Sequence, residues 1–208
     1  MKRVYFVRHG EAEGNSGGFS QTPTTPLTEK GKEQAQVVAK RFTSLPIEHV
    51  FASTMDRAQE TAAAIAAEKG LTVETSEYFH EWLKPTTVQG ASYESEAYKT
   101  YMAAEKAEYT NPDWRYEDGE NFADILQRVS EGVAMLEEHE GKELVVVSHG
   151  RLLRFLTSFL LHKKQLTAET EQLTSISMQA VNTGITLFTY EKGEWKLVTW
   201  NDCAHFAQ

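Results

Sequence analysis

Short, continuously apolar runs alternate with helix-forming segments along most of this chain, and this alternation is the feature that most constrains its fold. The runs expected to form buried strands are residues 4–7, 49–52, 71–73 and 144–147. The amphipathic, alanine-rich or apolar segments expected to form helices are residues 27–42, 55–69, 122–136 and 152–161. Continuous apolar strands are typical of a parallel sheet that helices cover on both faces. The pattern therefore predicts an α/β fold, a three-layer α/β/α sandwich with a largely parallel sheet.

Two segments depart from this alternation. Residues 185–190 and 195–200 flank Lys192-Gly193 and are typical of a β-hairpin, which would add strands of mixed direction to the sheet. Residues 80–118 are aromatic, mostly polar and poorly periodic, and they predict an inserted lid with some helix around residues 93–109. We expect a single domain over residues 1–208, with the lid insert at about 80–118.

Three predicted strand ends carry residues suited to phosphate chemistry. They are Arg8-His9-Gly10-Glu11, the segment from Ser53 to Arg57, and Ser148-His149-Gly150. In sheets of this kind ligands bind beyond the carboxyl ends of the strands. A neutral imidazole is a nucleophile at pH 7, and a guanidinium group matches phosphate oxygens bidentately. The leaving alkoxide needs a proton, and Glu81 at the start of the lid is a candidate donor.

At these residues the sequence resembles the histidine phosphatase superfamily, the fold family of cofactor-dependent phosphoglycerate mutase. The similarity runs through nearly the whole chain, in motifs that begin at Arg8, Leu27, Ser53, Gly119 and Ser148. Glycine after the second histidine is similar to the branch that takes a glutamate acid from the insert. The sequence departs from the family in two places: at Asn121, where many relatives have serine, and in the lid. These departures leave the identity of the substrate open and do not affect the class of reaction.

The resemblance implies a role for each of seven residues. His9 would be the phosphorylated nucleophile, with Glu81 and His149 as the other catalytic residues. The implied phosphate-binding residues are Arg8, Asn15, Arg57 and Gly150. The implied activity is that of a metal-independent phosphomonoesterase, which needs no cofactor and acts on a small phosphorylated metabolite through a phosphohistidine intermediate.

The sequence leaves structural and functional alternatives open. Arg8 and His9 fit a solvated strand end, Arg57 fits a surface helix residue paired with a neighbouring carboxylate, and Asn15 fits a turn. Glu81 fits a solvated lid carboxylate. Two other functions suit the same motifs: a phosphoglycerate-type mutase, which transfers the phosphoryl group, and a non-catalytic module that binds a phosphorylated ligand.

Composition restricts the partners of the chain. Its formal net charge of -9 provides no basic surface for nucleic acid or for an anionic membrane, so any attraction for phosphate must come from a few convergent cations. Cys203 is the only cysteine, and the histidines outside the motifs lack metal-ligand spacing, so we expect neither a disulfide nor a metal site. The sequence shows no signal-peptide pattern and no apolar stretch near the roughly 18 residues of a membrane span. A cytoplasmic location is expected.

Overall fold

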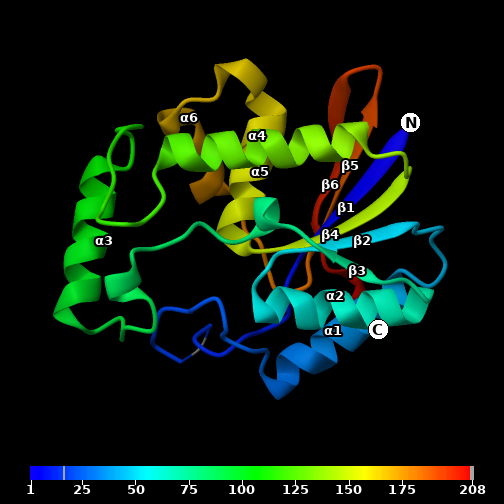
Figure 1. Cartoon of the computed structure of the whole chain (residues 1–208), viewed down its shortest axis with the longest axis horizontal. Helices are drawn as coiled ribbons and strands as arrows, with labels where there is room; N and C mark the ends of the chain where they lie inside the picture. The colour runs from blue at the N-terminus through cyan, green and yellow to red at the C-terminus, as the bar shows by residue number, and fades with distance from the viewer. Residues whose placement is uncertain (16, 207–208) are drawn as a thin grey trace.

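A computed structural model describes residues 1–15 and 17–206, and a six-stranded β-sheet forms its centre (Figure 1). The strands are β1 (Lys2–Arg8), β2 (His49–Ala52), β3 (Val73–Thr75), β4 (Glu143–Ser148), β5 (Ile185–Glu191) and β6 (Glu194–Asp202). Their order across the sheet is β3-β2-β4-β1-β5-β6. The first four are parallel to one another, whereas β5 and β6 form an antiparallel hairpin beside β1. The predicted largely parallel, mixed sheet is therefore confirmed.

The α-helices lie close to their predicted positions, with one addition. They are α1 (Glu29–Arg41), α2 (Asp56–Lys69), α3 (Glu96–Glu108), α4 (Phe122–Glu138), α5 (Gly150–His162) and α6 (Ala168–Ser177). The sequence did not predict α6, because its buried positions are Ala168, Glu171 and Ser175 and make no apolar stripe. In the part of the chain that the structure describes, no helix is long and apolar enough to cross a membrane.

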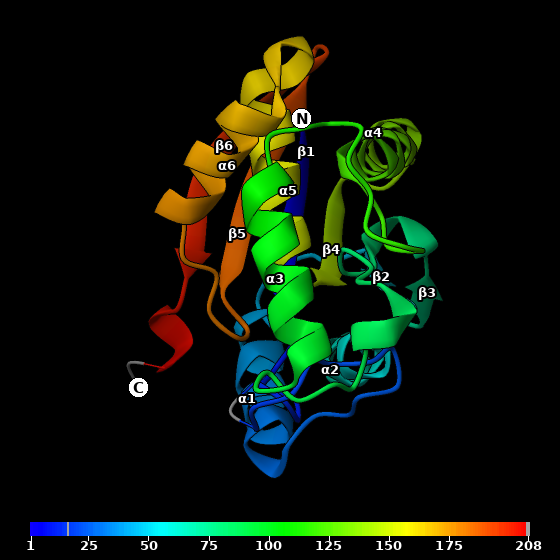
Figure 2. The same ribbon diagram turned by 90° about the vertical axis from the view of Figure 1, so that its left-hand side faces the viewer.

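The helices cover the sheet in two layers, one on each face (Figure 1, Figure 2). In β1, Val4 and Phe6 pack against α4 and α5, whereas Tyr5 and Val7 pack against α1 and α2. Residues of β4 alternate in the same way between the two clusters. Both strands are thus buried on two faces, which explains why their sequences are apolar throughout. The three-layer sandwich predicted from the sequence is confirmed.

The segment from residue 80 to residue 118 lies outside these layers. It extends past the carboxyl ends of the parallel strands, and α3 stands apart from the other helices (Figure 1). Its own packing is largely aromatic: Tyr101 is buried, and the ring centroids of Tyr101 and Tyr116 are 5.4 Å apart. The segment therefore covers the edge of the sheet at which the three motifs end.

The loop after β1 lies very close to the first turn of α1. A Cβ atom on Gly31 would be 1.8 Å from the carbonyl oxygen of Glu11, and one on Gly10 would be 2.4 Å from the oxygen of Gly31. Thr28 caps α1 at this contact: its Oγ1 accepts a hydrogen bond from the Gly31 N–H at 3.0 Å. Packing of backbone against backbone therefore fixes the direction in which the chain leaves β1 at His9.

We expect Gly31→Ala to lower the free energy of unfolding by about 1–3 kcal/mol. The added methyl group would overlap the Glu11 carbonyl and push the loop after β1 away from α1. Amide resonances of residues 9–11 should shift with it. Lys32→Ala is the matched control, since this exposed side chain pairs only with Glu29. Urea denaturation and two-dimensional NMR measure both effects. Wild-type stability of Gly31→Ala would contradict the contact.

Candidate active site

The carboxyl ends of β1, β4 and β2 are adjacent in the sheet and bring the three motifs together. Arg8 is in register with Ser148 across the β1–β4 ladder, and the His9 N–H donates to the Ser148 oxygen at 2.9 Å. The N–H of Ser53, after β2, donates to the main chain of β4 at 3.0 Å. As a result, the ring centroids of His9 and His149 are 5.0 Å apart.

His9 is held in one tautomer. Its side chain is buried, and Nδ1 lies 2.6 Å from the carbonyl oxygen of Gly10. Because that oxygen can only accept, Nδ1 carries the proton and Nε2 of the neutral ring keeps its lone pair. Burial, and then the charges of Arg57 and Arg8, lower the pKa of His9 well below its ordinary value of 6.5. At pH 7 the ring is therefore neutral, with a nucleophilic nitrogen available.

His149 is oriented by a hydroxyl group. Its Nε2 lies 2.7 Å from Ser53 Oγ, which itself accepts a hydrogen bond from the Met55 N–H at 3.1 Å. When the Ser53 hydroxyl donates to Nε2, the proton of the neutral ring is on Nδ1. Burial and the charge of Arg57 lower the pKa of His149 well below 6.5. In that tautomer a neutral His149 presents an N–H donor, and this Nδ1 has no partner among the described residues.

Arg8 and Arg57 place two guanidinium groups beside these rings. Arg8 Nη1 donates to the Ala180 oxygen at 2.6 Å, and Arg57 Nη1 donates to the Thr22 oxygen at 2.8 Å. Burial lowers the pKa of Arg57 to about 10, so the group remains cationic at pH 7. The buried Nε of each arginine lacks a partner among the described residues, like Nδ1 of His149. Buried N–H groups without partners are uncommon, and three that converge are suited to an anion.

Gly150 begins α5 directly after His149 and allows Arg8 to pack against the start of the helix. A Cβ atom at Gly150 would lie 3.3 Å from Arg8 Nε, closer than most side-chain contacts allow. The first turn of α5 also directs N–H groups and the positive end of the helix dipole toward the site. The predicted part of Gly150 in binding phosphate thus has a geometric basis, although its contact with phosphate stays a prediction.

Glu81 accepts hydrogen bonds from the first turn of α5. Its Oε1 accepts from the N–H groups of Leu152 at 2.9 Å and Trp82 at 3.0 Å, while Oε2 accepts from the Arg151 N–H at 3.1 Å. Oε2 therefore keeps more capacity for a further hydrogen bond than Oε1. Glu81 lines the same cavity as Arg57, so it is not the solvated lid carboxylate of the structural alternative.

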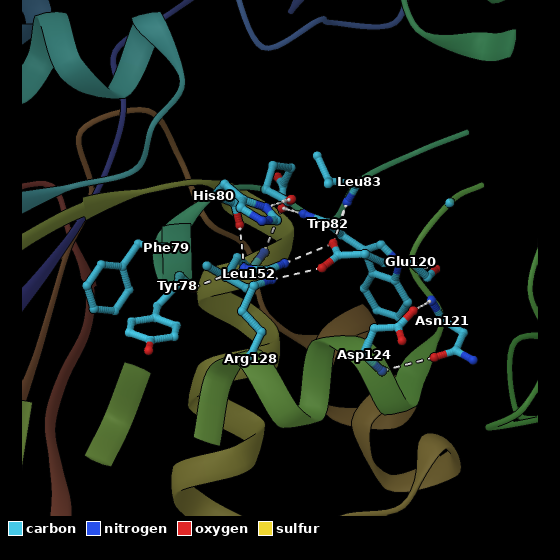
Figure 3. Close-up of polar contacts among 12 residues, drawn as sticks. Tyr78, Phe79, His80, Trp82, Leu83, Glu120, Asn121, Asp124, Arg128 and Leu152 are labelled. Carbon is cyan, nitrogen blue, oxygen red and sulfur yellow. Dashed lines mark hydrogen bonds and ion pairs between the residues drawn. The ribbon is translucent and has the colours of Figure 1, made fainter. Parts of the chain in front are cut away.

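A buried ion pair fixes the backbone around Glu81 (Figure 3). Arg128, on α4, pairs bidentately with Glu120 at 2.8 and 2.9 Å. The remaining nitrogen, Nη1, donates to the carbonyl oxygens of Tyr78 at 2.9 Å and His80 at 3.0 Å. These contacts hold the chain just before the carboxylate. Glu120 and Arg128, in the motif that begins at Gly119, thus support the candidate acid.

The start of α4 anchors that ion pair. Asn121 and Asp124 form a reciprocal capping box, with both hydrogen bonds at 2.9 Å (Figure 3). Glu120 precedes this cap, and its Oε2 also accepts from the Leu83 N–H at 2.7 Å. The backbone is thus held on both sides of the candidate acid.

A cavity of about 270 Å³ lies beside this site, and Arg57 and Glu81 line it together with residues of the lid. His9 and His149 are buried and do not line it, nor does Arg8. Asn15 lines it, but its Oδ1 accepts from the Ala12 N–H at 2.8 Å and closes the local turn. The turn role is therefore real, and contact of Asn15 with phosphate stays a prediction. Within residues 1–15 and 17–206, no group of three or more His, Cys, Asp or Glu side chains is arranged to hold a metal ion.

Four residues of this site had no role assigned to them from the sequence. They are Ser53, which orients His149, and Lys84, Glu105 and Arg151, which line the cavity. Arg151 Nη1 pairs with Glu105 Oε1 at 2.7 Å, and its guanidinium carbon lies 3.7 Å from the centroid of the Trp82 ring. Two of the four residues lie beside motifs that are visible in the sequence. Ser53 begins the segment that ends at Arg57, and Arg151 directly follows Ser148-His149-Gly150, so their positions were a signal that could have identified them.

The chain belongs to the histidine phosphatase superfamily. The family profile described as histidine phosphatase superfamily (branch 1) matches residues 4–203, nearly the whole chain. This confirms the identification from the motifs at the strand ends. The profile match supports the family and leaves the roles of individual residues as predictions.

Relatives and solved structures agree with this assignment. A probable phosphoglycerate mutase, GpmB, of Enterobacter sp. (strain 638) is 31% identical over 206 residues, which cover 96% of this chain and 90% of the relative. A phosphoserine phosphatase mutant from Entamoeba histolytica, in complex with phosphoserine, has a TM-score of 0.76 at 27% identity and covers 99% of each chain. A mycobacterial glucosyl-3-phosphoglycerate phosphatase, in complex with VO3, has a TM-score of 0.78 at 26% identity and covers 97% of this chain and 99% of its own.

We expect the imidazole of His9 to stay neutral below pH 6.5, because burial and two guanidinium groups disfavour its protonated form. Its NMR titration midpoint should lie below 6.5, with resonances assigned from the spectrum of His9→Gln. Arg57→Met removes one of the two cations, so the midpoint of His9 should move up in that variant. A wild-type midpoint at or above 6.5 would show that the site does not hold the neutral ring.

Proposed function

We propose that this histidine phosphatase hydrolyses a small phosphomonoester in two steps through a phosphohistidine at His9. The observation that carries the proposal is the environment of His9. Burial and two guanidinium charges lower the pKa of the ring, Nδ1 is bonded to a carbonyl oxygen, and Nε2 has no hydrogen-bond partner among the described residues. Beside it lie three buried N–H groups without partners among the described residues, on Arg8, Arg57 and His149. A nucleophile and an anion-binding set at one point are what attack on a phosphate ester requires.

In the first step Nε2 of His9 attacks phosphorus, and the bond from phosphorus to the ester oxygen breaks. The guanidinium groups of Arg8 and Arg57 and Nδ1–H of His149 neutralise the equatorial oxygens. The ring of His9 gains positive charge, which the Gly10 oxygen stabilises through the hydrogen bond from Nδ1. Protonated Glu81 gives its proton to the departing oxygen, so the product leaves as an alcohol.

In the second step water attacks the phosphohistidine, and the nitrogen–phosphorus bond breaks. The Glu81 carboxylate accepts the proton of that water, which returns the acid to its starting state. Inorganic phosphate leaves, and His9 is again neutral with its proton on Nδ1. Fixed guanidinium groups carry the charge that a metal ion carries in other phosphatases, and the neutral His149 adds a hydrogen-bond donor, so we propose that no metal takes part.

The names of the relatives bear on the fate of the phosphohistidine. Two similar solved structures are named as phosphatases, whereas the relative from Enterobacter is named a probable phosphoglycerate mutase. A mutase returns the phosphoryl group to the substrate, whereas a phosphatase gives it to water. We propose hydrolysis as the main reaction and mutase activity as the second candidate, which the name of that relative favours.

His9→Ala should abolish turnover of p-nitrophenyl phosphate and remove the acid-labile, base-stable phosphate from enzyme quenched during turnover of a labelled ester. Wild-type turnover should be unchanged by EDTA. For wild type, released phosphate should exceed any isomerised 3-phosphoglycerate, which a coupled assay detects as 2-phosphoglycerate. Retained activity of His9→Ala would rule out His9 as the nucleophile. Activity that is lost with EDTA and restored by a divalent ion would rule out metal independence. Isomerisation in excess of phosphate release would favour the mutase.

Glu81→Gln should reduce kcat/KM for an alkyl phosphate by roughly 100-fold or more, because an alkoxide leaves only with a proton. For p-nitrophenyl phosphate the loss should be under about tenfold, since nitrophenolate is already a stable anion. The glutamine keeps one acceptor oxygen for α5. The test compares the two losses in one enzyme preparation. Equal losses would mean that Glu81 positions the site and donates no proton, and Glu94 and Glu96 would be the next carboxylates to test.

A further inference from the structure

At the lid side of the cavity, Lys84 places an ammonium group in a half-buried position. Its Nζ lies 3.3 Å from two hydroxyl groups, those of Ser20 and Tyr98, and 5.2 Å from the centroid of the Tyr98 ring. Among the described residues no carboxylate oxygen lies within 4.0 Å of it. Burial lowers the pKa of Lys84. Two long hydrogen bonds to hydroxyl groups compensate a buried charge poorly, so an anion is favoured here.

Another cation that lines the cavity, Arg151 of α5, is already neutralised. Arg151 Nη1 pairs with Glu105 Oε1 at 2.7 Å, and the Tyr101 hydroxyl donates to the same oxygen at 2.7 Å. Burial and this carboxylate have opposite effects on Arg151, and the net result is a raised pKa. Of the cations that line the cavity, Arg57 and Lys84 thus remain without a paired carboxylate, whereas the charge of Arg151 is balanced.

Arg57 and Lys84 both donate hydrogen bonds to the loop that contains Ser20 and Thr22. Arg57 donates to the oxygen of Thr22 at 2.8 Å, and Lys84 donates to Oγ of Ser20 at 3.3 Å. Both residues also line the same cavity of about 270 Å³. One small molecule with two anionic groups in this cavity can therefore contact both cations.

We propose that Lys84 binds a carboxylate of the substrate while Arg8 and Arg57 hold its phosphate, so that the substrate class is a small phosphorylated carboxylic acid. The proposal rests on the phosphomonoesterase function above. A carboxylate fits better than a second phosphate for two reasons. A single ammonium group matches one negative charge, and the guanidinium fork that a phosphate dianion prefers is occupied, since Arg151 holds Glu105.

The probes are 3-phosphoglycerate and glycerol 3-phosphate, which differ only in that a carboxylate replaces a hydroxymethyl group. In wild type, kcat/KM for the carboxylate should exceed that for the alcohol by about tenfold or more, as for a hydrogen bond between charged groups. Lys84→Met keeps the length of the side chain and removes the charge, so this ratio should fall to near one. Lys84→Arg should retain most of the preference. Because the ratio is taken within one protein, a change in the folded fraction cancels.

Lys99→Met is the matched control, because Lys99 is an exposed lid lysine that pairs with Glu94 outside the cavity. It should keep the wild-type ratio. Hydrolysis of both probes at equal kcat/KM by wild type would overturn the carboxylate site and leave the phosphatase function standing. An unchanged ratio in Lys84→Met, or an equal fall in Lys99→Met, would overturn the role of Lys84. Failure to hydrolyse either probe or p-nitrophenyl phosphate would overturn both the phosphatase function and the site that rests on it.

Discussion

Burial of two guanidinium groups beside two neutral imidazoles is the constraint on which the rest of the site depends. Arg8 and Arg57 bond to main-chain carbonyl oxygens, which accept hydrogen bonds without neutralising the charge. Burial, and then that charge, lower the pKa of His9 and of His149, so both rings are kept neutral. A carboxylate in direct contact with either arginine would weaken both effects. The site therefore stores positive charge for a ligand, in a chain whose net charge is -9.

The scaffold meets this constraint by taking each group from a different rigid element. Adjacent parallel strands bring the motifs to one edge, and the contact between Gly10 and Gly31 directs the chain as it leaves β1. The Glu120–Arg128 pair has a similar effect on the candidate acid, because it holds the backbone next to Glu81. Breaking a buried pair of this kind leaves an uncompensated charge, so its effect on the site would reach beyond its own contacts.

The fold was predictable where one physical cause acts on neighbouring residues. Val4 to Val7 are apolar on both faces because helices cover both, and that pattern is visible in the sequence. The helix α6 was missed because Glu171 and Ser175, polar residues, occupy its buried positions. The roles of the cations that line the cavity were not predictable for a related reason. Among the described residues Arg151 pairs directly with a carboxylate and Lys84 does not, and that difference depends on contacts between residues far apart in the sequence.

The hydrogen bonds of Glu81 connect the candidate acid to one helix of the scaffold. Its carboxylate accepts from three N–H groups, two of them in the first turn of α5. In the proposed mechanism, a phosphate held by Arg8, Arg57 and His149 would approach the same positive helix end. The hydrogen bonds from α5 would then fix where the Glu81 carboxyl group lies relative to the departing oxygen.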